Sequence, residues 1–564
     1  MKKCGIVTIK LVILFIVFCR CGTKDRPPVV LPTPIILTKA LIGTEQAVLS
    51  TTTNAELNHN INTSTTFTLQ FNKPVDKSSV ANAITFFENG NNRFPLNFTY
   101  SKGDSVVIVS PATALKPLTF YSLGISRSLL SVQKTGLNAD VIINLNTQID
   151  SSNKFPLVSD DELLTIVQQR TFKYFWDFAH PISGLARERS NATPETVTSG
   201  GSGFGIMAIP VAINRNFITR AEGLARMQTI VNFLKTKARR FHGAFPHWLN
   251  GSTGDVIPFS AKDDGADLVE TSYLIMGLLT VRQYFDGADL AETKLRNDIN
   301  SIWQEVEWDW FRKNGTNVLY WHWSPNVGWD MNMTIKGWNE ALITYVLAAS
   351  SPTHAIPKSV YDSGWASNGA MIHGQTYHGY QLPLGPTYGG PLFFAHYSFM
   401  GIDPRGLSDA YANYETQTRN HTLINYNYCI VNPRNWFGYS DKVWGLTASD
   451  IFNGYSASSP TNDKGFIAPT AALSSFPYTP TESMKALKFF YYTLGDKIFK
   501  DYGFMDAFSL HSLYYSNSFL AIDQGPIIAM IENHRSQLLW KLFTSCPEVK
   551  TGMKTVLGFT APYL

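Results

Sequence analysis

Cysteine is scarce in this sequence, which has five in 564 residues, and three of them fall within the first 21 positions. Only Cys429 and Cys546 lie in the rest of the chain, too few for a disulfide framework. Packing of apolar side chains therefore has to hold the fold, and the 44% hydrophobic and 13% aromatic fractions provide for a large core. A chain of 564 residues predicts two or three domains.

Charge is sparse as well. Charged residues make up 16% of the chain and the formal net charge is +4, and no basic run of the kind that binds nucleic acid is present. Beyond the N-terminal segment, no apolar stretch approaches the ~20 residues that cross a bilayer. We therefore expect neither a nucleic-acid partner nor an internal membrane span.

Several catalytic and metal-binding motifs are also missing. The sequence has no HExxH, no CxxC and no GxSxG, and His373 and His378 have poor spacing for a helical metal pair. A Ser-His-Asp triad built from distant residues stays open. The glycine-rich segment near Gly200 follows no clear strand and precedes no phosphate-binding lysine, so a turn is predicted there. We expect no metal and no organic cofactor.

The sequence begins with a segment typical of export. Two lysines precede an apolar stretch at about 11–18, and residues 1–21 together predict a signal peptide. Cys21 closes this segment, and the proline-rich residues 22–34 are predicted to be a tether. This arrangement resembles a bacterial lipoprotein signal and predicts lipidation at Cys21, with simple secretion as the alternative. We expect a periplasmic or cell-surface lipoprotein of a Gram-negative bacterium, held at a membrane by its lipid.

A small β domain is predicted over residues 35–150. Short alternating runs at 66–71 and 105–109 are separated by Gly, Asn and Pro, which is typical of a β-sandwich. The stretch LQFNKPVDKSSV, residues 69–80, resembles the bacterial Ig-like domains that begin many exported proteins. We expect this domain to be a spacer, with carbohydrate binding as a minor alternative.

Residues 158–564 show helical patterns of two kinds. Capping boxes, of which Ser159 with Glu162 is one, begin amphipathic helices that keep one face in water. Other segments are apolar on every side and predict buried helices, at 267–281, 338–349 and 522–542. One-sided helices alternating with buried helices predict two concentric layers, an (α/α) barrel. The number of helices does not follow from the pattern.

Acids cluster where the first buried helix begins. Asp263, Asp267 and Glu270 lie four and three residues apart, so a helix would carry all three on one face. Two like charges about 6 Å apart repel by roughly 3 kcal/mol at an effective dielectric near 20, and the helical neighbours include no Lys or Arg. Asp263 or Asp264 is the candidate N-cap. Asp267 and Glu270 lie too far in to cap, and we interpret them as a catalytic pair.

Glu340 occupies a similar place at the start of the second buried helix. Two inner helices that each present an acid at the same end would direct both into one cleft, although a first-turn acid favoured by the helix dipole is an equal alternative. Paired carboxylates in a cleft are what glycoside hydrolysis needs, because one protonates the leaving oxygen and the other activates water or attacks.

Aromatic residues are dense in the long loops between the helices. Four tryptophans, Trp321, Trp323, Trp329 and Trp338, fall in one loop, and Trp248 follows His247 in FPHWLN. Sugar rings pack their C–H faces on aromatic rings. We therefore expect His247, Trp248, Trp321, Trp323 and Trp338 to contact an oligosaccharide or polysaccharide.

Four stretches carry a family resemblance: GAFPHWLNGSTG (243–254), PFSAKDDGADLVETSYLIMGLL (258–279), GWNEALITYVLAASSP (337–352) and DQGPIIAMIEN (523–533). Through them, the region from about residue 160 onward resembles the glucoamylase-like (α/α)6-barrel proteins of bacteria. It resembles in particular the β-1,2-glucan hydrolases of glycoside hydrolase family 144. The resemblance implies an (α/α)6 barrel and an inverting attack on β-1,2-glucan that releases sophorose or longer oligosaccharides.

The resemblance also bears on individual residues. It implies that Asp263, Asp267, Glu270 and Glu340 are the acids needed for activity, without indicating which one donates the proton. The segment GLARERS, 184–190, has a glutamate, Glu188, where relatives often have Asp, and we include Glu188 among the expected substrate contacts.

Two other functions compete with hydrolysis. A surface glycan-binding lipoprotein would keep the aromatic cleft without needing facing acids, and a polysaccharide lyase on a helical toroid would need an acidic substrate and a Tyr, His or Arg cluster. Loop lengths around the cleft decide between internal and terminal cleavage, which the sequence leaves open. We expect a monomer.

Overall fold

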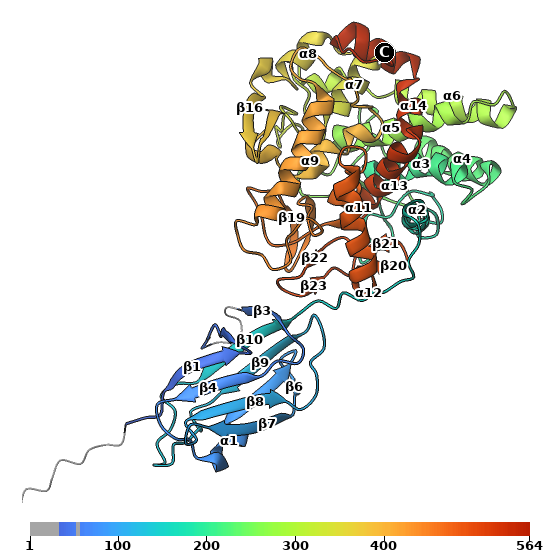
Figure 1. The fold of residues 1–564 in the computed structure, drawn as a ribbon. Helices are drawn as coiled ribbons and strands as arrows, with labels where there is room; N and C mark the ends of the chain where they lie inside the picture. The colour runs from blue at the N-terminus through green and yellow to red at the C-terminus, as the bar shows by residue number, and fades with distance from the viewer. Residues whose placement is uncertain (1–32, 52–56) are drawn as a thin grey trace, which may run out of the picture. The chain divides into compact units, whose positions relative to one another are not determined.

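The computed structural model describes residues 33–51 and 57–564 and divides the chain into two compact units, one ending at Thr147 and the other spanning Gln148–Leu564 (Figure 1). The predicted signal peptide, its Cys21 and most of the 22–34 tether lie outside the described residues. Within the described ranges, no helix combines the length and the apolar character needed to cross a membrane.

The first unit is a sandwich of two five-stranded sheets, ordered β2-β1-β4-β8-β7 and β3-β10-β9-β5-β6. Its strands are β1 (Leu37–Ile42), β2 (Glu45–Gln46), β3 (Leu57–Ile61), β4 (Phe67–Phe71), β5 (Ile84–Glu88), β6 (Asn92–Arg93), β7 (Leu96–Ser101), β8 (Val106–Pro111), β9 (Phe120–Ile125) and β10 (Val141–Thr147). In β4, the buried Phe67, Leu69 and Phe71 alternate with the less buried Thr68 and Gln70, because successive side chains point to opposite faces. The predicted β-sandwich is confirmed.

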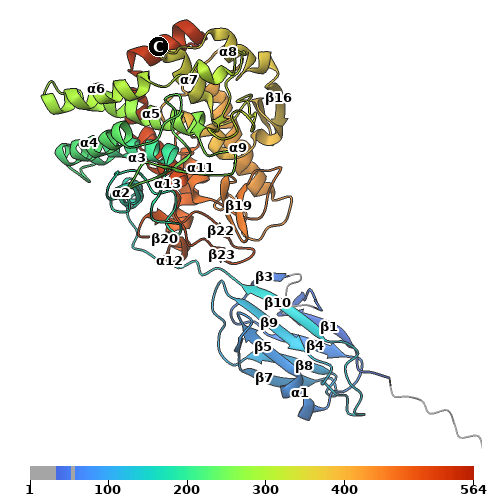
Figure 2. The same cartoon turned by 180° about the vertical axis from the view of Figure 1, so that it is seen from behind.

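The second unit is the predicted (α/α)6 barrel, in which outer helices alternate along the chain with buried inner segments. The outer helices are α2 (Asp160–Trp176), α4 (Arg220–Thr236), α6 (Leu290–Gln304), α8 (Lys358–Ser363), α9 (Tyr414–Val431) and α11 (Pro480–Lys488). The inner segments are α3 (Ser199–Asn214), α5 (Leu268–Tyr284), α7 (Leu342–Ser350), the 3₁₀ turns η4 (Leu392–Ala395) and η5 (Ser398–Met400), α10 (Pro469–Leu473) and α13 (Ala521–Arg535). In the inner layer α3 packs between α5 and α13. Figures 1 and 2 show α4 and α6 side by side on the outside.

The predicted N-cap of α2 is confirmed, whereas the start of one inner helix and the end of another differ from prediction. The Ser159 side chain accepts the backbone N–H of Glu162 at the start of α2, which is one of the two bonds of a capping box, whereas Thr219 and Glu222 form both bonds at the start of α4. The inner helix predicted at 338–349 begins only at Leu342. The helix predicted at 522–542 is divided into α13 and α14 (Leu538–Thr544), because Gln537 adopts a left-handed φ of 63°.

The glycine-rich segment near Gly200 is the first half of α3 and not the predicted turn. Its glycines are needed where α3 meets α5. A Cβ on Gly203 would lie 2.2 Å from the Tyr273 carbonyl oxygen, and a Cβ on Gly277 would lie 2.2 Å from the Gly203 carbonyl oxygen. The two backbones therefore approach more closely than any larger residue allows.

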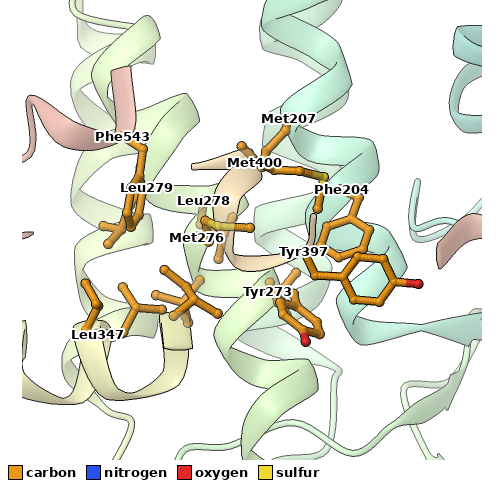
Figure 3. Close-up of a cluster of buried hydrophobic side chains, with 14 of the residues drawn as sticks. Phe204, Met207, Tyr273, Met276, Leu278, Leu279, Leu347, Tyr397, Met400 and Phe543 are labelled. Atoms are coloured by element: carbon orange, nitrogen blue, oxygen red, sulfur yellow. The ribbon is translucent and has the colours of Figure 1, made fainter. Parts of the chain in front are cut away.

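The barrel core surrounds α5 on all sides. Figure 3 shows Leu347 of α7 and Phe543 of α14 beside the apolar face of α5, and the rings of Phe204, Tyr273 and Tyr397 grouped beside α3. The ring centroids in this group are 5.1, 5.3 and 5.7 Å apart. This packing fixes the start of α5 relative to α3 and α7, and the candidate acids lie at that start.

Candidate active site

Asp267 is the N-cap of α5 and contacts two histidines. Its Oδ1 accepts the backbone N–H groups of Val269 at 3.0 Å and Glu270 at 2.9 Å. Its Oδ2 lies 3.1 Å from His247 Nδ1 and 3.5 Å from His322 Nε2. The short strands β14 (Ala266–Asp267) and β15 (His322–Trp323) pair Asp267 with His322. Burial disfavours charge on this carboxylate, but hydrogen bonds from the two imidazoles hold its pKa below the usual range.

These contacts correct the prediction that Asp267 lies too far into the helix to cap it. One carboxylate oxygen satisfies two free N–H groups of the first turn, and the other is left for the imidazoles. The histidines also offset the clustered negative charge that had no basic partner on the helix. They come from other parts of the chain, His322 from strand β15 and His247 from the segment before Trp248, so the residues of α5 do not reveal them.

Asp263 lies in the loop before α5, so the prediction of three acids on one helical face is wrong. Its backbone pairs with Ser260 in an isolated bridge, and its Oδ2 lies 3.4 Å from His322 Nε2. The side chain is 4% exposed and its Oδ1 has no hydrogen-bond partner in the structure. Burial and the neighbouring Asp267 raise the pKa of Asp263 to about 6. Asp263 therefore titrates close to neutral pH.

Glu270 lies in the first turn of α5 and faces the start of α3. Its Oε2 accepts the backbone N–H of Gly200 at 2.8 Å and the hydroxyl of Thr198 at 3.3 Å. Burial raises the pKa of Glu270, and Asp267 adds to this while His247 opposes it. Burial also opposes charge on His247, yet the carboxylates of Glu270 and Asp267 outweigh it and raise the His247 pKa to about 9. Glu270 thus has a cationic imidazole beside it at neutral pH.

Glu340 lies in the turn before α7, not in its first turn, and is partly exposed. Its backbone carbonyl accepts the hydroxyls of Tyr273, at 3.4 Å, and Ser398, which hold this turn against α5 and η5. Burial raises the pKa of Glu340 to about 7, and the negative charges of Glu270 and Asp267 contribute to the shift. Glu340 is therefore substantially protonated at neutral pH, whereas Asp267 is ionised.

A cavity of about 560 Å³ opens beside Glu270. Its lining includes Glu188, Arg189, His247, Trp248, Glu270 and Tyr455. The volume lies in the range of binding sites for small organic ligands. Of the candidate acids, Glu188 and Glu270 line this cavity, whereas Asp263, Asp267 and Glu340 are not among its lining residues. A larger cavity of about 750 Å³, between α2, α11 and the end of α13, contains none of the candidate acids, so we assign the substrate site to the smaller one.

The tryptophans of the 320–338 loop do not line this cavity. Trp338 is 4% exposed and packs in the core against Trp365 and Phe399, so its predicted sugar contact is not supported. Trp321 stacks on His322. Trp323 packs against the rings of Trp310 and Phe241. Of these rings, Trp321 contacts a histidine of the site, His322.

A second group of carboxyls adjoins the cavity, and of its members the sequence predicted Glu188 as a substrate contact but not Asp450 or Asp506. Arg189 bridges Glu188, at 3.1 Å, and Asp450, at 3.2 Å. Asp506 Oδ2 accepts the backbone N–H of Asp450 at 2.6 Å, and Asp523 shares a hydrogen bond with Asp506. Burial raises the pKa of both Asp506, to about 7, and Asp523, and their mutual contact implies one shared proton. Asp523 opens the DQGP helix start noted in the sequence, but Asp450 and Asp506 lie in segments without any motif.

One set of side chains has the composition of a metal site. The ligand atoms of His247, Asp263 and Asp267 lie within 4.8 Å of one another and could hold a divalent cation. The same side chains already balance charge among themselves, because the Asp267 carboxylate is hydrogen-bonded to the imidazole of His247.

Comparison with known proteins gives two family matches. The Glycoamylase family model, described as "Putative glucoamylase", matches residues 332–547, and the bacterial Ig-like domain model matches residues 43–147. An exo-β-1,2-glucooligosaccharide sophorohydrolase (non-reducing end) from Parabacteroides distasonis is 44% identical over 432 residues, which cover 73% of this chain and 60% of that protein. The chain thus spans less than two thirds of the length of this curated relative.

Two solved structures extend the likeness. An endo-β-1,2-glucanase from Chitinophaga pinensis, in complex with sophorotriose and glucose, is 53% identical, with a TM-score of 0.71 over 72% of this chain and 100% of that chain. A β-1,2-glucanase from Parabacteroides distasonis is 36% identical, with a TM-score of 0.69 over 92% of this chain and 74% of that chain.

Proposed function

This chain belongs to the glucoamylase-like family that includes β-1,2-glucan hydrolases, and from that membership we propose that it is a glycoside hydrolase acting on β-1,2-linked glucan. The observation that carries the proposal is the separation of protonation states at one site. Glu340 keeps its proton near neutral pH, while Asp267 is ionised and Glu270 is stabilised by N–H and O–H donors. An acid and a base set apart by their surroundings are what glycosidic cleavage requires.

The proposed reaction is a single displacement. Glu340 donates its proton to the glycosidic oxygen as the bond from that oxygen to the anomeric carbon breaks. Glu270 accepts a proton from a water molecule whose oxygen forms the new bond to the anomeric carbon, which inverts its configuration. Asp267 touches no substrate in this scheme. It positions the start of α5 and holds His247, whose positive charge opposes the rise that burial causes in the pKa of Glu270.

The chemistry is tested with linear β-1,2-glucan. We expect new reducing ends and, by NMR during the first turnovers, the α-anomer released first. Glu340→Gln and Glu270→Gln should each lower kcat by about 10²- to 10⁴-fold with little change in thermal unfolding. Retention of glucan binding without any product would favour a glycan-binding protein instead. Absorbance from an unsaturated sugar would indicate a lyase, for which the cavity offers His247, Arg189 and Tyr455.

We also propose that the protein is exported and lipidated at Cys21. The motivation is the charged, apolar and cysteine-terminated segment 1–21, followed by a proline-rich stretch. Metabolic labelling with a fatty-acid probe should mark the wild-type protein in the membrane fraction. Cys21→Ala should abolish the label and release the protein from the membrane, whereas equal labelling of both proteins would refute lipidation.

A further inference from the structure

Three exposed aromatic rings gather around one part of the barrel. In the described residues, the large apolar side chains left exposed include Phe259 at 51%, Phe452 at 69% and Tyr455 at 47%. Phe259 and Tyr455 line the 560 Å³ cavity, and Phe452 lies three residues from Tyr455. Exposed aromatic rings scattered over a surface need no explanation, but a cluster at a cavity indicates binding.

Phe452 is placed by the hairpin of β18 (Ala448–Ile451) and β19 (Gly454–Ala457). Ala448 pairs with Ala457 and Asp450 with Tyr455. Ala448, Tyr455 and Ala457 all line the cavity. Phe452 and Asn453 form the two-residue turn between these strands, so Phe452 lies at the tip of the hairpin whose strands line the cavity. The hairpin that lines the cavity thus carries an exposed aromatic ring at its tip.

The ring of Phe452 is held by a second aromatic residue. Its centroid lies 6.3 Å from that of Tyr514 at an interplanar angle of 62°, and Tyr514 in turn packs on Phe466 at 5.3 Å. Phe452 occupies a tight turn, where Gly, Asn, Asp or Ser would be the usual residue, and it contributes little buried area to the fold. Its neighbours Asn453 and Ser456 are uncharged, which suits a neutral polymer rather than an ionic one.

We propose that Phe452 and Tyr514 form an aromatic platform outside the cavity that binds further glucose units of a β-1,2-glucan chain. This inference rests on the proposed function, and it names the residues that would make the enzyme prefer longer glucan chains. A short oligosaccharide fills the cavity without reaching Phe452, whereas a longer chain packs a sugar face on the ring. The platform therefore increases the preference for long substrates.

The test compares substrates of different length. Phe452→Ala should lower the ratio of kcat/KM on long β-1,2-glucan to kcat/KM on the shortest cleaved oligosaccharide by about three- to tenfold, mainly through KM. Phe452→Trp should restore the ratio, because it keeps a ring at the same position. Leu290→Ala, which truncates a 90% exposed side chain on α6, is the matched control and should leave the ratio unchanged.

The outcomes separate this inference from the function beneath it. If the wild type cleaves β-1,2-glucan but Phe452→Ala changes both lengths equally or neither, the platform is refuted and the function stands. If the wild type does not cleave β-1,2-glucan, and calorimetry with Glu340→Gln detects no β-1,2-glucan binding, both the platform and the proposed function are refuted. A length-dependent loss in Phe452→Ala with rescue by Trp supports the platform, provided that the thermal unfolding of the variants matches the wild type.

Discussion

Replacement of Gly200 by alanine tests whether Glu270 has to be held where α3 begins. A Cβ on Gly200 would lie 2.5 Å from Glu270 Oε2 and 2.8 Å from Tyr273 Cδ2. Ordinary contact begins near 3.4 Å, so the carboxylate has to retreat by about 0.9 Å. The hydrogen bond from the Gly200 N–H, now 2.8 Å, then lengthens beyond bonding distance. A displacement near 1 Å at a catalytic group lowers kcat by about 100-fold.

Gly205→Ala is the matched control for this variant. It lies in the same helix, and its Cβ would meet the Phe175 ring at 2.5 Å rather than a carboxylate. Both substitutions overfill the core at a cost of about 1–3 kcal/mol, partly offset by the better helix propensity of alanine. We expect similar decreases in unfolding free energy, measured by denaturant titration, but a loss of kcat on β-1,2-glucan only for Gly200→Ala. Equal activity losses in the two variants, or full activity in Gly200→Ala, would refute the role of this contact.

Three further predictions concern ionisable groups. In the wild type, kcat should fall as pH rises through about 7, where Glu340 loses the proton that it donates; a pH–rate profile without this limb contradicts that assignment. The pKa of His247 in the folded protein, about 9, is above its unfolded value near 6.5. The contribution of the protonated imidazole to the free energy of unfolding is therefore complete below pH 6.5 and is lost as pH rises through 9. His247→Gln should remove up to roughly 3 kcal/mol of this pH-dependent stability, measured as unfolding free energy at pH 6 and 9.5. Asp523→Asn should have nearly the wild-type free energy of unfolding, because the amide still donates a hydrogen bond to Asp506. Asp523→Ala should lower the free energy of unfolding by about 1–3 kcal/mol. Equal losses in the two variants would argue against the shared proton.

The layered fold follows from local patterns, and for that reason it could be predicted. A stretch of about 10 to 20 residues is enough to show a capping residue and to distinguish a helix that is apolar on one side from a helix that is apolar all round. The glycine-rich start of α3 was missed because its glycines serve contacts with α5, about 70 residues later in the chain, as the approach of Gly203 to Gly277 shows. A turn and a closely packed helix start have the same composition, and only the partner distinguishes them.

The site was predicted in part for the same reason. Glu270, His247 and Trp248 line the cavity as expected, because each lies near a helix start or in an aromatic loop. Trp338 belongs to the same loop pattern but packs in the core, since aromatic density does not show which rings face inward. Asp506 and its partners could not be predicted, because their three segments meet only in the folded chain.

Asp267, Glu270 and Glu340 lie where inner helices begin, and their different pKa shifts follow from what each carboxyl group contacts there. Helix N-termini favour anions and burial disfavours them, so the balance depends on the donors within reach. Asp267 receives two N–H groups and two imidazoles and is ionised. Glu340 lies just outside α7, and burial raises its pKa more than a backbone hydrogen bond lowers it, with the charges of Glu270 and Asp267 adding to the rise. Because Glu340 lies before the first turn of α7 and not within it, burial is the dominant effect on its pKa, as the role of proton donor requires.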